Sequence, residues 1–515
     1  MADRPEVGPL SKEAAEDVRT VAKGGAVQVV GQFSQRGLSF VFQAIAYRIL
    51  GQSPYGLFRQ VSQVLTIAGQ LGLAGFNYAS MRWIARARAA GQPGGVRGAA
   101  KVGAWASVIG SAIVVTGLLL LAETLGSSFG DSAVDDAEFA RLFRIGAAYV
   151  PFFALLQVFR YCTQAYKTMV PSVTAGNVVQ PTIRFVLGTA LLLAGFEVAG
   201  AIVSLVVSVG ISAVVAFWFF HRMMTEAERT ATPIRETGAM VRFALPQAGA
   251  SLLGIQSLGL GILLLGLLED NAAAGAFGVA LSLQGPANIF LGGIVNIWAP
   301  IVSDLHEKGE IARLDGLYKT INRWIATFSF PVAAALIVEA DLFTRLFGGE
   351  EGVAAAPAVA ALAVGNIFYT GTGPTGYVIS MTGRPFVNLI NSIVAVLLYV
   401  GLGLLVVPDH GFVGMAWVDS GVTAVVNMAR VVQAKWIVGV QPFGRTFYKP
   451  VAATLAGAAV LVPWSLFADD NLYLEIAGIA AGAAVYLLML KLFGLDPEEQ
   501  HVWKRIRKRA FRRGR

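Results

Sequence analysis

Residues 198–221 read VAGAIVSLVVSVGISAVVAFWFFH and contain no Asp, Glu, Lys or Arg. Residues 386–407, FVNLINSIVAVLLYVGLGLLVV, are equally free of charge. An α-helix rises about 1.5 Å per residue, so about 20 apolar residues span the roughly 30 Å hydrocarbon core of a bilayer. Both stretches therefore predict helices that cross a membrane.

The rest of the chain has the same character. It is 515 residues long, 55% hydrophobic and only 14% charged, whereas a soluble chain carries about 25% charged residues. No loop is long enough to hold a soluble domain. We therefore predict an all-α polytopic membrane protein with about fourteen transmembrane helices. The expected spans are residues 22–50, 55–86, 98–122, 143–168, 173–195, 198–221, 239–268, 273–304, 321–341, 354–381, 386–407, 412–435, 448–467 and 471–493.

The loop charges predict the orientation. Of the 40 Lys and Arg residues, about 32 fall on alternate loops and the two ends, as expected for the cytoplasmic side. We count three in the opposite loops and five inside spans, so both termini are expected in the cytoplasm and the protein in the cytoplasmic membrane. The tail, residues 503–515 (WKRIRKRAFRRGR), carries eight bases and is expected to lie on anionic lipid rather than to bind nucleic acid.

Two sequence echoes indicate an internal repeat. Gly56-Leu57-Phe58 matches Gly275-Ala276-Phe277 at an offset of 219 residues, and Lys167 and Arg384 follow corresponding spans 217 residues apart. A duplicated six-helix unit keeps its orientation, so the two copies would form lobes related by a parallel pseudo-twofold axis, with two extra C-terminal helices. The expected divisions are 1–21 (cytoplasmic segment), 22–222 (N-lobe, spans 1–6), 223–238 (cytoplasmic linker), 239–440 (C-lobe, spans 7–12), 441–493 (spans 13 and 14) and 494–515 (basic cytoplasmic tail).

Five arginines fall inside the first six spans. Arg36 and Arg184 lie near mid-span, Arg160 lies in the inner half, and Arg48 and Arg59 lie near the outer end, where they could also reach the membrane surface. An arginine at a helix centre costs on the order of 2.5–3.5 kcal/mol by insertion scales. No acid of these six spans lies at mid-membrane, so the enclosed space would be net positive and would attract an anion such as a phosphate or diphosphate.

Polar side chains recur at helical spacing beside these arginines and place them on faces turned away from lipid. Bonds between packed helices would explain single glutamines equally well. The residues expected to contact the substrate in the cationic cavity are Arg36, Arg59, Arg160, Arg184, Gln32, Gln63 and Asn177.

The second six spans are rich in Asn, Gln, Ser and Tyr, which suit sugar hydroxyls or helix packing. Asp419 is the clear acid inside a span. It is a candidate site for a coupling H⁺ or Na⁺, with a structural partner for an arginine or a backbone group as the alternative.

The sequence contains few of the residue patterns that indicate an enzyme or a metal site. The single Cys162 excludes a disulfide framework and a cysteine metal cluster, and the four histidines are scattered. We expect no catalytic residues, no metal and no cofactor, although a gradient of H⁺ or Na⁺, or the membrane potential, could drive transport. A membrane polymerase or glycosyltransferase would need a large outer loop or a carboxylate and histidine cluster, and neither is present.

Five short motifs in order resemble the multidrug/oligosaccharidyl-lipid/polysaccharide exporter superfamily, and most closely its polysaccharide biosynthesis (O-antigen-type) flippases. They are LGQSPYGLF (50–58), GLAGFNYASMRWIARA (72–87), AAAGAFGVA (272–280), IWAPIVSDLHEKGE (297–310) and MTGRPF (381–386). The resemblance covers about residues 20–493. It implies a two-lobed bundle that alternates between inward-open and outward-open states, with Arg36 and Arg59 as cavity arginines of the family type.

The resemblance also implies a substrate, an oligosaccharide on a polyprenyl diphosphate. Lipid II, the peptidoglycan precursor, is an alternative cargo that the family also contains. A cation-coupled drug exporter is less compatible, since that class usually has an acidic cavity. Expected partners are the lipid-linked substrate, membrane lipids, and polymerases or glycosyltransferases of the same pathway, with a monomeric transport unit.

Overall fold

A computed structural model describes residues 12–129, 133–252, 259–468 and 471–494. Every regular element in these ranges is helical, which confirms the all-α membrane-protein fold. The predicted basic tail and the first part of the N-terminal segment lie outside the described residues.

The first half of the chain begins with the longest unbroken helix before the linker, α1 (Lys12–Leu50). The other elements of this half are α2 (Gln52–Leu73), α3 (Phe76–Ala89), α4 (Pro93–Phe129), α5 (Ala133–Gly146), α6 (Tyr149–Gln164), α7 (Val170–Val173), the π-helix η1 (Thr174–Val179), α8 (Gln180–Leu193), α9 (Glu197–Met223) and α10 (Glu226–Thr230).

The second half begins at α11 (Thr237–Leu252) and is also entirely helical where it is described. Its other elements are α12 (Leu260–Leu268), α13 (Asn271–Leu283), η3 (Pro286–Asn288), α14 (Ile289–Glu307), α15 (Ile311–Val338), α16 (Ala340–Gly348), η4 (Glu350–Ala355), α17 (Ala356–Thr372), α18 (Thr375–Met381), α19 (Pro385–Ile437), η5 (Arg445–Phe447), α20 (Tyr448–Ala468) and α21 (Leu472–Phe493).

Ten helices of the described residues are long and apolar enough to cross a membrane. The count of fourteen spans and the duplicated lobes stay predictions, because several spans are divided or merged. The span expected at 55–86 is two helices, since Ala74 (φ 45) and Gly75 (φ 76) adopt left-handed conformations that end α2 and begin α3. The spans expected at 386–407 and 412–435 form the single long element α19, which kinks at Gly411 (φ 58, ψ −153).

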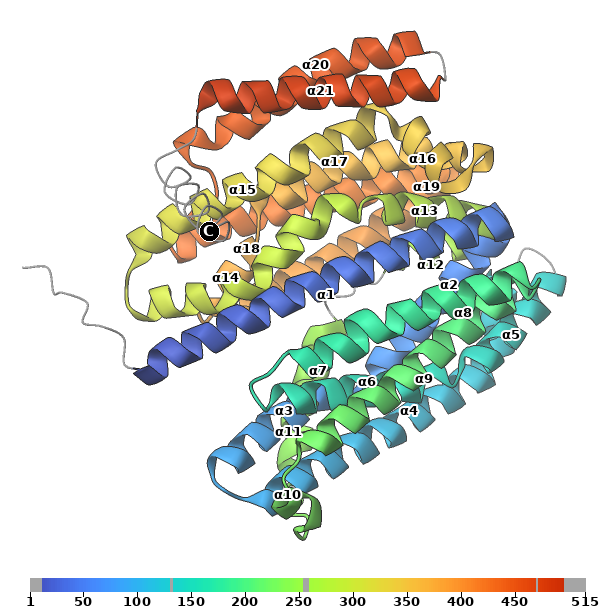
Figure 1. The fold of residues 1–515 in the computed structure, drawn as a ribbon. Helices are drawn as coiled ribbons and strands as arrows, with labels where there is room; N and C mark the ends of the chain where they lie inside the picture. Colours follow the sequence, from blue (N-terminus) through green and yellow to red (C-terminus); the bar gives the residue numbers. More distant parts are fainter. Residues whose placement is uncertain (1–11, 130–132, 253–258, 469–470, 495–515) are drawn as a thin grey trace, which may run out of the picture.

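Figure 1 shows two groups of helices with α1 running between them. One group, called here the first bundle, contains α2–α9, and the other, the second bundle, contains α12–α19. The hairpin of α20 and α21 lies on the far side of the second bundle, where α20 packs against α15.

The two bundles meet most extensively where α2 packs against α13. A Cβ atom on Gly56 would lie 1.7 Å from the carbonyl oxygen of Asn271, and one on Gly275 would lie 2.2 Å from that of Gln52. Only glycine permits so close a backbone approach. The two copies of the sequence echo thus face each other, and this contact closes the predicted outer end of the molecule.

Hydrogen bonds reinforce the same contact. Gln60 Nε2 donates to Asn271 Oδ1 at 2.8 Å, and Gln52 Nε2 donates to the carbonyl oxygen of Ala272 at 3.1 Å. Gln60 and Asn271 are both buried. The polar residues at this end therefore serve to hold the bundles together.

Candidate functional site

The candidate site is built around arginines on α1, α2, α6 and α8, and two of the breaks between helices lie next to these elements. Between α7 and α8 the chain forms one turn of π-helix, and π-helical turns in membrane helices often accompany functional sites. The left-handed break between α2 and α3 is a second interruption, packed against α11. Broken helices release backbone groups at mid-membrane, where transporters commonly bind their cargo.

Arg59 joins three helices. Its Nη1 donates to Gln43 Oε1 of α1, to Tyr55 Oη at 3.4 Å within α2, and to Ser282 Oγ of α13 at 3.2 Å. Ser282 in turn donates to Gln43 at 2.8 Å. Arg59 therefore lies just inside the closed contact between the bundles and links them through side chains that can exchange partners.

Arg184 lies in an aromatic setting within the first bundle. Its guanidinium carbon is 5.1 Å from the centroid of Phe42 and 5.6 Å from that of Phe58, so the group makes cation–π contacts with both rings. Its Nε is buried and has no hydrogen-bond partner in the described part of the chain. The groups that act on it electrostatically are the hydroxyls of Tyr149 and Tyr55 and the guanidinium of Arg59.

Arg160 has different surroundings. Its three nitrogens donate to the carbonyl oxygen of Ser172 at 3.1 Å, to Gln157 Oε1 at 3.3 Å and to Asn177 Oδ1 at 2.9 Å. Asn177 then donates to Gln35 Oε1 of α1 at 2.7 Å. A Cβ on Gly176 would lie 2.3 Å from the Arg160 guanidinium carbon. Arg160 and Asn177 thus bind the π-helical turn to α6 and α1.

Arg36 reaches from α1 to the second bundle. Its Nη2 lies 2.9 Å from the position of a Cβ on Gly292 of α14, and Gln32 Oε1 lies 3.4 Å from the same point. No hydrogen bond or ion pair to its guanidinium is found among the described residues. The nearest polar group that acts on it electrostatically is the hydroxyl of Tyr369 on α17.

Arg430 was missed by the sequence interpretation, which placed all intramembrane arginines in the first six spans. It lies on α19 within a predicted span, one turn after Asn427, whose Oδ1 accepts from its Nη1 at 3.4 Å. Its Nε is buried without a hydrogen-bond partner in the described ranges. Tyr369 is 40% exposed and interacts electrostatically with both Arg36 and Arg430, so the two arginines act on one hydroxyl.

The remaining predicted residues occupy separate positions. Gln63 Oε1 lies 2.9 Å from the Cβ position of Gly259, next to the start of α12. Arg48 donates to the carbonyl oxygens of Leu346 and Phe347 at the end of α16, which is a structural helix-capping role. We call the region between Arg36, Gln32 and Arg430 the cationic space, and Arg59 and Arg184 interact with each other outside it.

Asp419 is well separated from these arginines in its interactions. It accepts side-chain hydrogen bonds from Tyr399 and Thr423, and within the described residues no lysine or arginine pairs with it. The arginine-partner alternative for Asp419 therefore finds no support in the structure. No group of three or more His, Cys, Asp or Glu in the described chain is placed to hold a metal ion.

A pocket on the predicted outer face has the opposite charge. Burial, followed by the neighbouring Asp270, raises the pKa of the Glu269 carboxyl above its ordinary value. An anion would be repelled here, so this pocket is distinct from the cationic space. Its lining residues are Gln52, Glu269, Asp270, Ala272, Ala273, His410, Gly411 and Phe412.

Comparisons with solved structures place the fold among membrane transporters. The chain is similar to the lipid II flippase MurJ in an inward closed conformation, with a TM-score of 0.72 and 13% identity over 91% of this chain and 98% of that one. It is similar to an inward-facing multidrug resistance MATE family transporter, with a TM-score of 0.68 and 17% identity over 80% and 98%. A third similar structure is a MOP superfamily transporter from Pyrococcus furiosus, with a TM-score of 0.60 and 17% identity over 84% and 97%.

Sequence comparison identifies the family. No curated protein sequence matches the chain. The family model described as "Polysaccharide biosynthesis protein" matches residues 21–306, which is more than half of the 515 residues. The match includes α1 to α9 and the motifs around Gly56 and Gly275. This multi-pass membrane protein therefore belongs to the polysaccharide biosynthesis protein family, and it has the fold of the MurJ and MATE transporters.

Proposed function

We propose that the chain is a flippase that moves a polyprenyl-diphosphate-linked oligosaccharide across the cytoplasmic membrane by alternating access. The family match and the transporter fold support this proposal at the level of a lipid-linked flippase or exporter. The cationic space supports the finer statement about the cargo.

The observation that carries the proposal is a set of arginines inside the helices that lack acidic partners. In the described residues no carboxylate pairs with Arg36, Arg184 or Arg430. Each such charge costs several kcal/mol in the membrane interior unless an anion neutralises it. A diphosphate offers the charge and the paired oxygens that guanidinium groups bind in a bidentate manner.

The arrangement of these groups supports a path for the head group. Arg36 lies on α1, between the bundles, and Arg430 lies on α19 of the second bundle, so a diphosphate bound by both would link these two helices. Arg59 and Arg184 lie deeper, towards the contact that closes the predicted outer end. Opening that contact requires Arg59 to give up Ser282, and a passing diphosphate would be an alternative partner for its guanidinium. The polyprenyl chain would stay in the bilayer throughout.

A binding measurement tests the proposed cargo. Purified protein should bind polyprenyl diphosphate more tightly than polyprenyl monophosphate, as measured by native mass spectrometry. Arg36→Ala should weaken diphosphate binding about 10- to 100-fold, because a hydrogen bond to a charged group contributes about 1.5–3 kcal/mol. Arg313→Ala, which removes an exposed arginine paired with Glu310, is the matched control. Equal affinity for the two lipids would contradict the proposal.

A lipid II flippase is the second candidate, because the MurJ structure gives a TM-score of 0.72. Lipid II also carries its sugars on a polyprenyl diphosphate, so the arginines accommodate either cargo. Competition between lipid II and an oligosaccharide lipid in the same binding experiment separates them. A drug exporter for cations is disfavoured by the positive charge of the cavity.

Asp419 is the candidate for ion coupling. A carboxyl group that accepts hydrogen bonds from Tyr399 and Thr423 and has no cationic partner among described residues can take up H⁺ or Na⁺ without breaking an ion pair. Asp419→Asn should remove the dependence of transport on an imposed gradient while leaving lipid binding intact. Unchanged gradient dependence in this variant would reject the assignment.

A further inference from the structure

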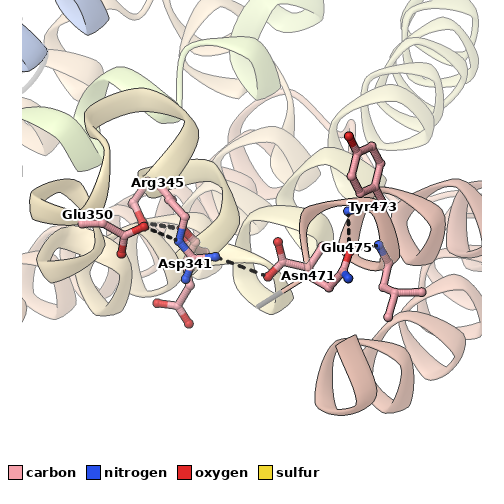
Figure 2. A network of polar contacts seen from close by, with 9 residues as sticks. Asp341, Arg345, Glu350, Asn471, Tyr473 and Glu475 are labelled. Carbon is pink, nitrogen blue, oxygen red and sulfur yellow. Dashed lines mark hydrogen bonds and ion pairs between the residues drawn. The ribbon is translucent and has the colours of Figure 1, made fainter. Parts of the chain in front are cut away.

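The C-terminal hairpin is attached to the second bundle by few polar contacts. Its helices pack tightly on each other, since a Cβ on Gly457 of α20 would lie 2.9 Å from the carbonyl oxygen of Gly482 of α21. Near the middle of α21, Tyr486 Oη donates to the carbonyl oxygen of Thr327 on α15 at 2.5 Å. At the start of α21, Glu475 reaches the second bundle, where Arg345 Nη1 lies 3.9 Å from its Oε1 (Figure 2).

Two carboxyl groups at this second attachment are buried and incompletely paired. Glu339, directly after α15, is 3% exposed, and Glu475 is 6% exposed. Glu339 Oε1 and Glu475 Oε2 have no hydrogen-bond partner among the described residues. A buried carboxylate that lacks partners is unfavourable in its charged form, and the usual response is to bind a proton.

The surrounding charges increase this tendency. Glu339 faces Glu475 of α21 and Asp341 of α16, and both raise its proton affinity. Arg345 of α16 provides positive charge, but its Nε also lies 3.5 Å from Oε1 of Glu350 in η4 (Figure 2). The Arg345 guanidinium is thus shared between Glu475 and Glu350. Asp469 and Asp470, which follow α20 in the sequence, lie outside the described residues.

We propose that Glu339 is a proton-binding site that fastens α21 to the second bundle, so that uptake of one proton favours docking of the C-terminal hairpin. Protonation converts the Glu339 carboxylate to a neutral carboxylic acid and removes its repulsion with Glu475, while Arg345 continues to pair with Glu475. A proton is the ligand that fits, because no group of carboxylates in the described chain is placed to enclose a metal ion. The site lies apart from the cationic space and does not depend on the proposed function.

The direction of the pH dependence follows from the burial. Burial first, and then Glu475 and Asp341, raise the pKa of Glu339 to about 7. With the hairpin displaced, Glu339 would be exposed and its pKa would return to about 4.3. The docked state therefore holds one more proton between these values. The docking equilibrium should weaken about tenfold per pH unit as the pH rises through this window and change little above it.

Distance measurements between spin labels on the full chain in lipid nanodiscs test the proposal. Labels at Leu346 on α16 and Tyr473 on α21, both exposed, report on docking in a Cys162→Ala background. We expect the short, docked distance to predominate at pH 5.5. At pH 8 the ratio of the longer, undocked distance to the short one should be at least tenfold higher than at pH 5.5. Identical distance distributions at the two pH values would overturn the proposal.

Two carboxyl variants identify the responsible group. Glu339→Gln imitates the protonated form and should keep the short distance at both pH values. Glu350→Gln is the matched control, because Glu350 pairs with the same arginine but is largely exposed, and it should retain the full pH response. If Glu339→Gln does not insert, Glu475→Gln provides a second test, since it removes the repelling charge and should shift the response to lower pH. A wild-type response in Glu339→Gln or in Glu475→Gln would also overturn the proposal.

Discussion

Two buried arginines of the first bundle have opposite surroundings. Arg160 donates to three protein acceptors and holds the π-helical turn in place. Arg184 has aromatic rings on its faces, another arginine nearby, and an Nε without a partner in the described chain. A structural arginine donates its hydrogen bonds to acceptors of the protein, whereas a binding arginine has donors that remain available to a ligand. The bonds of Arg160 are those of a structural residue, and we propose a binding role for Arg184.

Substitution by methionine should separate these roles. Arg160→Met leaves three acceptors, two of them on the buried residues Ser172 and Asn177, without this donor and should lower the free energy of unfolding by about 2 kcal/mol or more. Arg184→Met removes a buried charge with no acidic partner, and should leave the stability unchanged or raise it by about 1–4 kcal/mol while abolishing transport. Thermal unfolding of the two purified variants measures the difference. A large loss of stability in Arg184→Met would show that its charge is needed by the fold.

The sequence allowed the arginines of the first bundle to be found but not their partners. Arg36 and Arg184 stand out because each is a charged residue near the middle of an apolar segment. Arg430 escaped notice because it lies near the end of its span, in a region of bases assigned to the cytoplasm. The contact of Arg160 with Asn177 depends on a π-helical turn, and no residue pattern in the sequence predicts that turn. Tertiary packing decides which arginine finds hydrogen-bond acceptors within the protein. The sequence alone therefore could not separate structural arginines from candidate binding arginines.

At the scale of the elements, α2 and α13 form the closest contact between the bundles, and we propose that this contact is the gate at the predicted outer end. The repeated motif around Gly56 and Gly275 was recognisable in the sequence, but not the fact that its two copies pack against each other. The close backbone approach at these glycines leaves no room for a methyl group. The closed contact therefore requires glycine at both positions.

A single added methyl group should open this contact. In Gly56→Ala the new Cβ would lie 1.7 Å from the carbonyl oxygen of Asn271, so the helices must separate. We expect a cysteine at Gln60, which is buried in the closed contact, to react with a water-soluble maleimide at least tenfold faster in the Gly56→Ala background. Gly117→Ala on α4 is the control, because nothing lies within 4 Å of its Cβ position. Equal reactivity in both backgrounds would contradict the gate assignment.

At the scale of the whole molecule, composition and charge distribution were enough to predict an all-helical membrane protein, and the transporter fold agrees. The number of spans was harder to predict, because breaks at Gly75 and Gly411 divide or merge the apolar segments without changing their hydrophobicity. Helix α1 and the second bundle contribute to the cationic space, with Arg36 of α1 beside Gly292 of α14 and with Arg430 on α19. Such a space between two bundles suits a cargo that must be released when they separate.

The central claim is that unpaired arginines inside the bundle carry an anionic, lipid-linked cargo across the membrane. The most direct test is the flipping rate of a polyprenyl-diphosphate-linked oligosaccharide in proteoliposomes, followed by the access of an external glycosidase to the sugar. The wild type and Arg313→Ala should flip the lipid. Arg36→Ala and Arg184→Ala should insert normally, with wild-type elution in size-exclusion chromatography, but should fall to the rate of protein-free vesicles. Flipping at the wild-type rate in both variants would contradict the account.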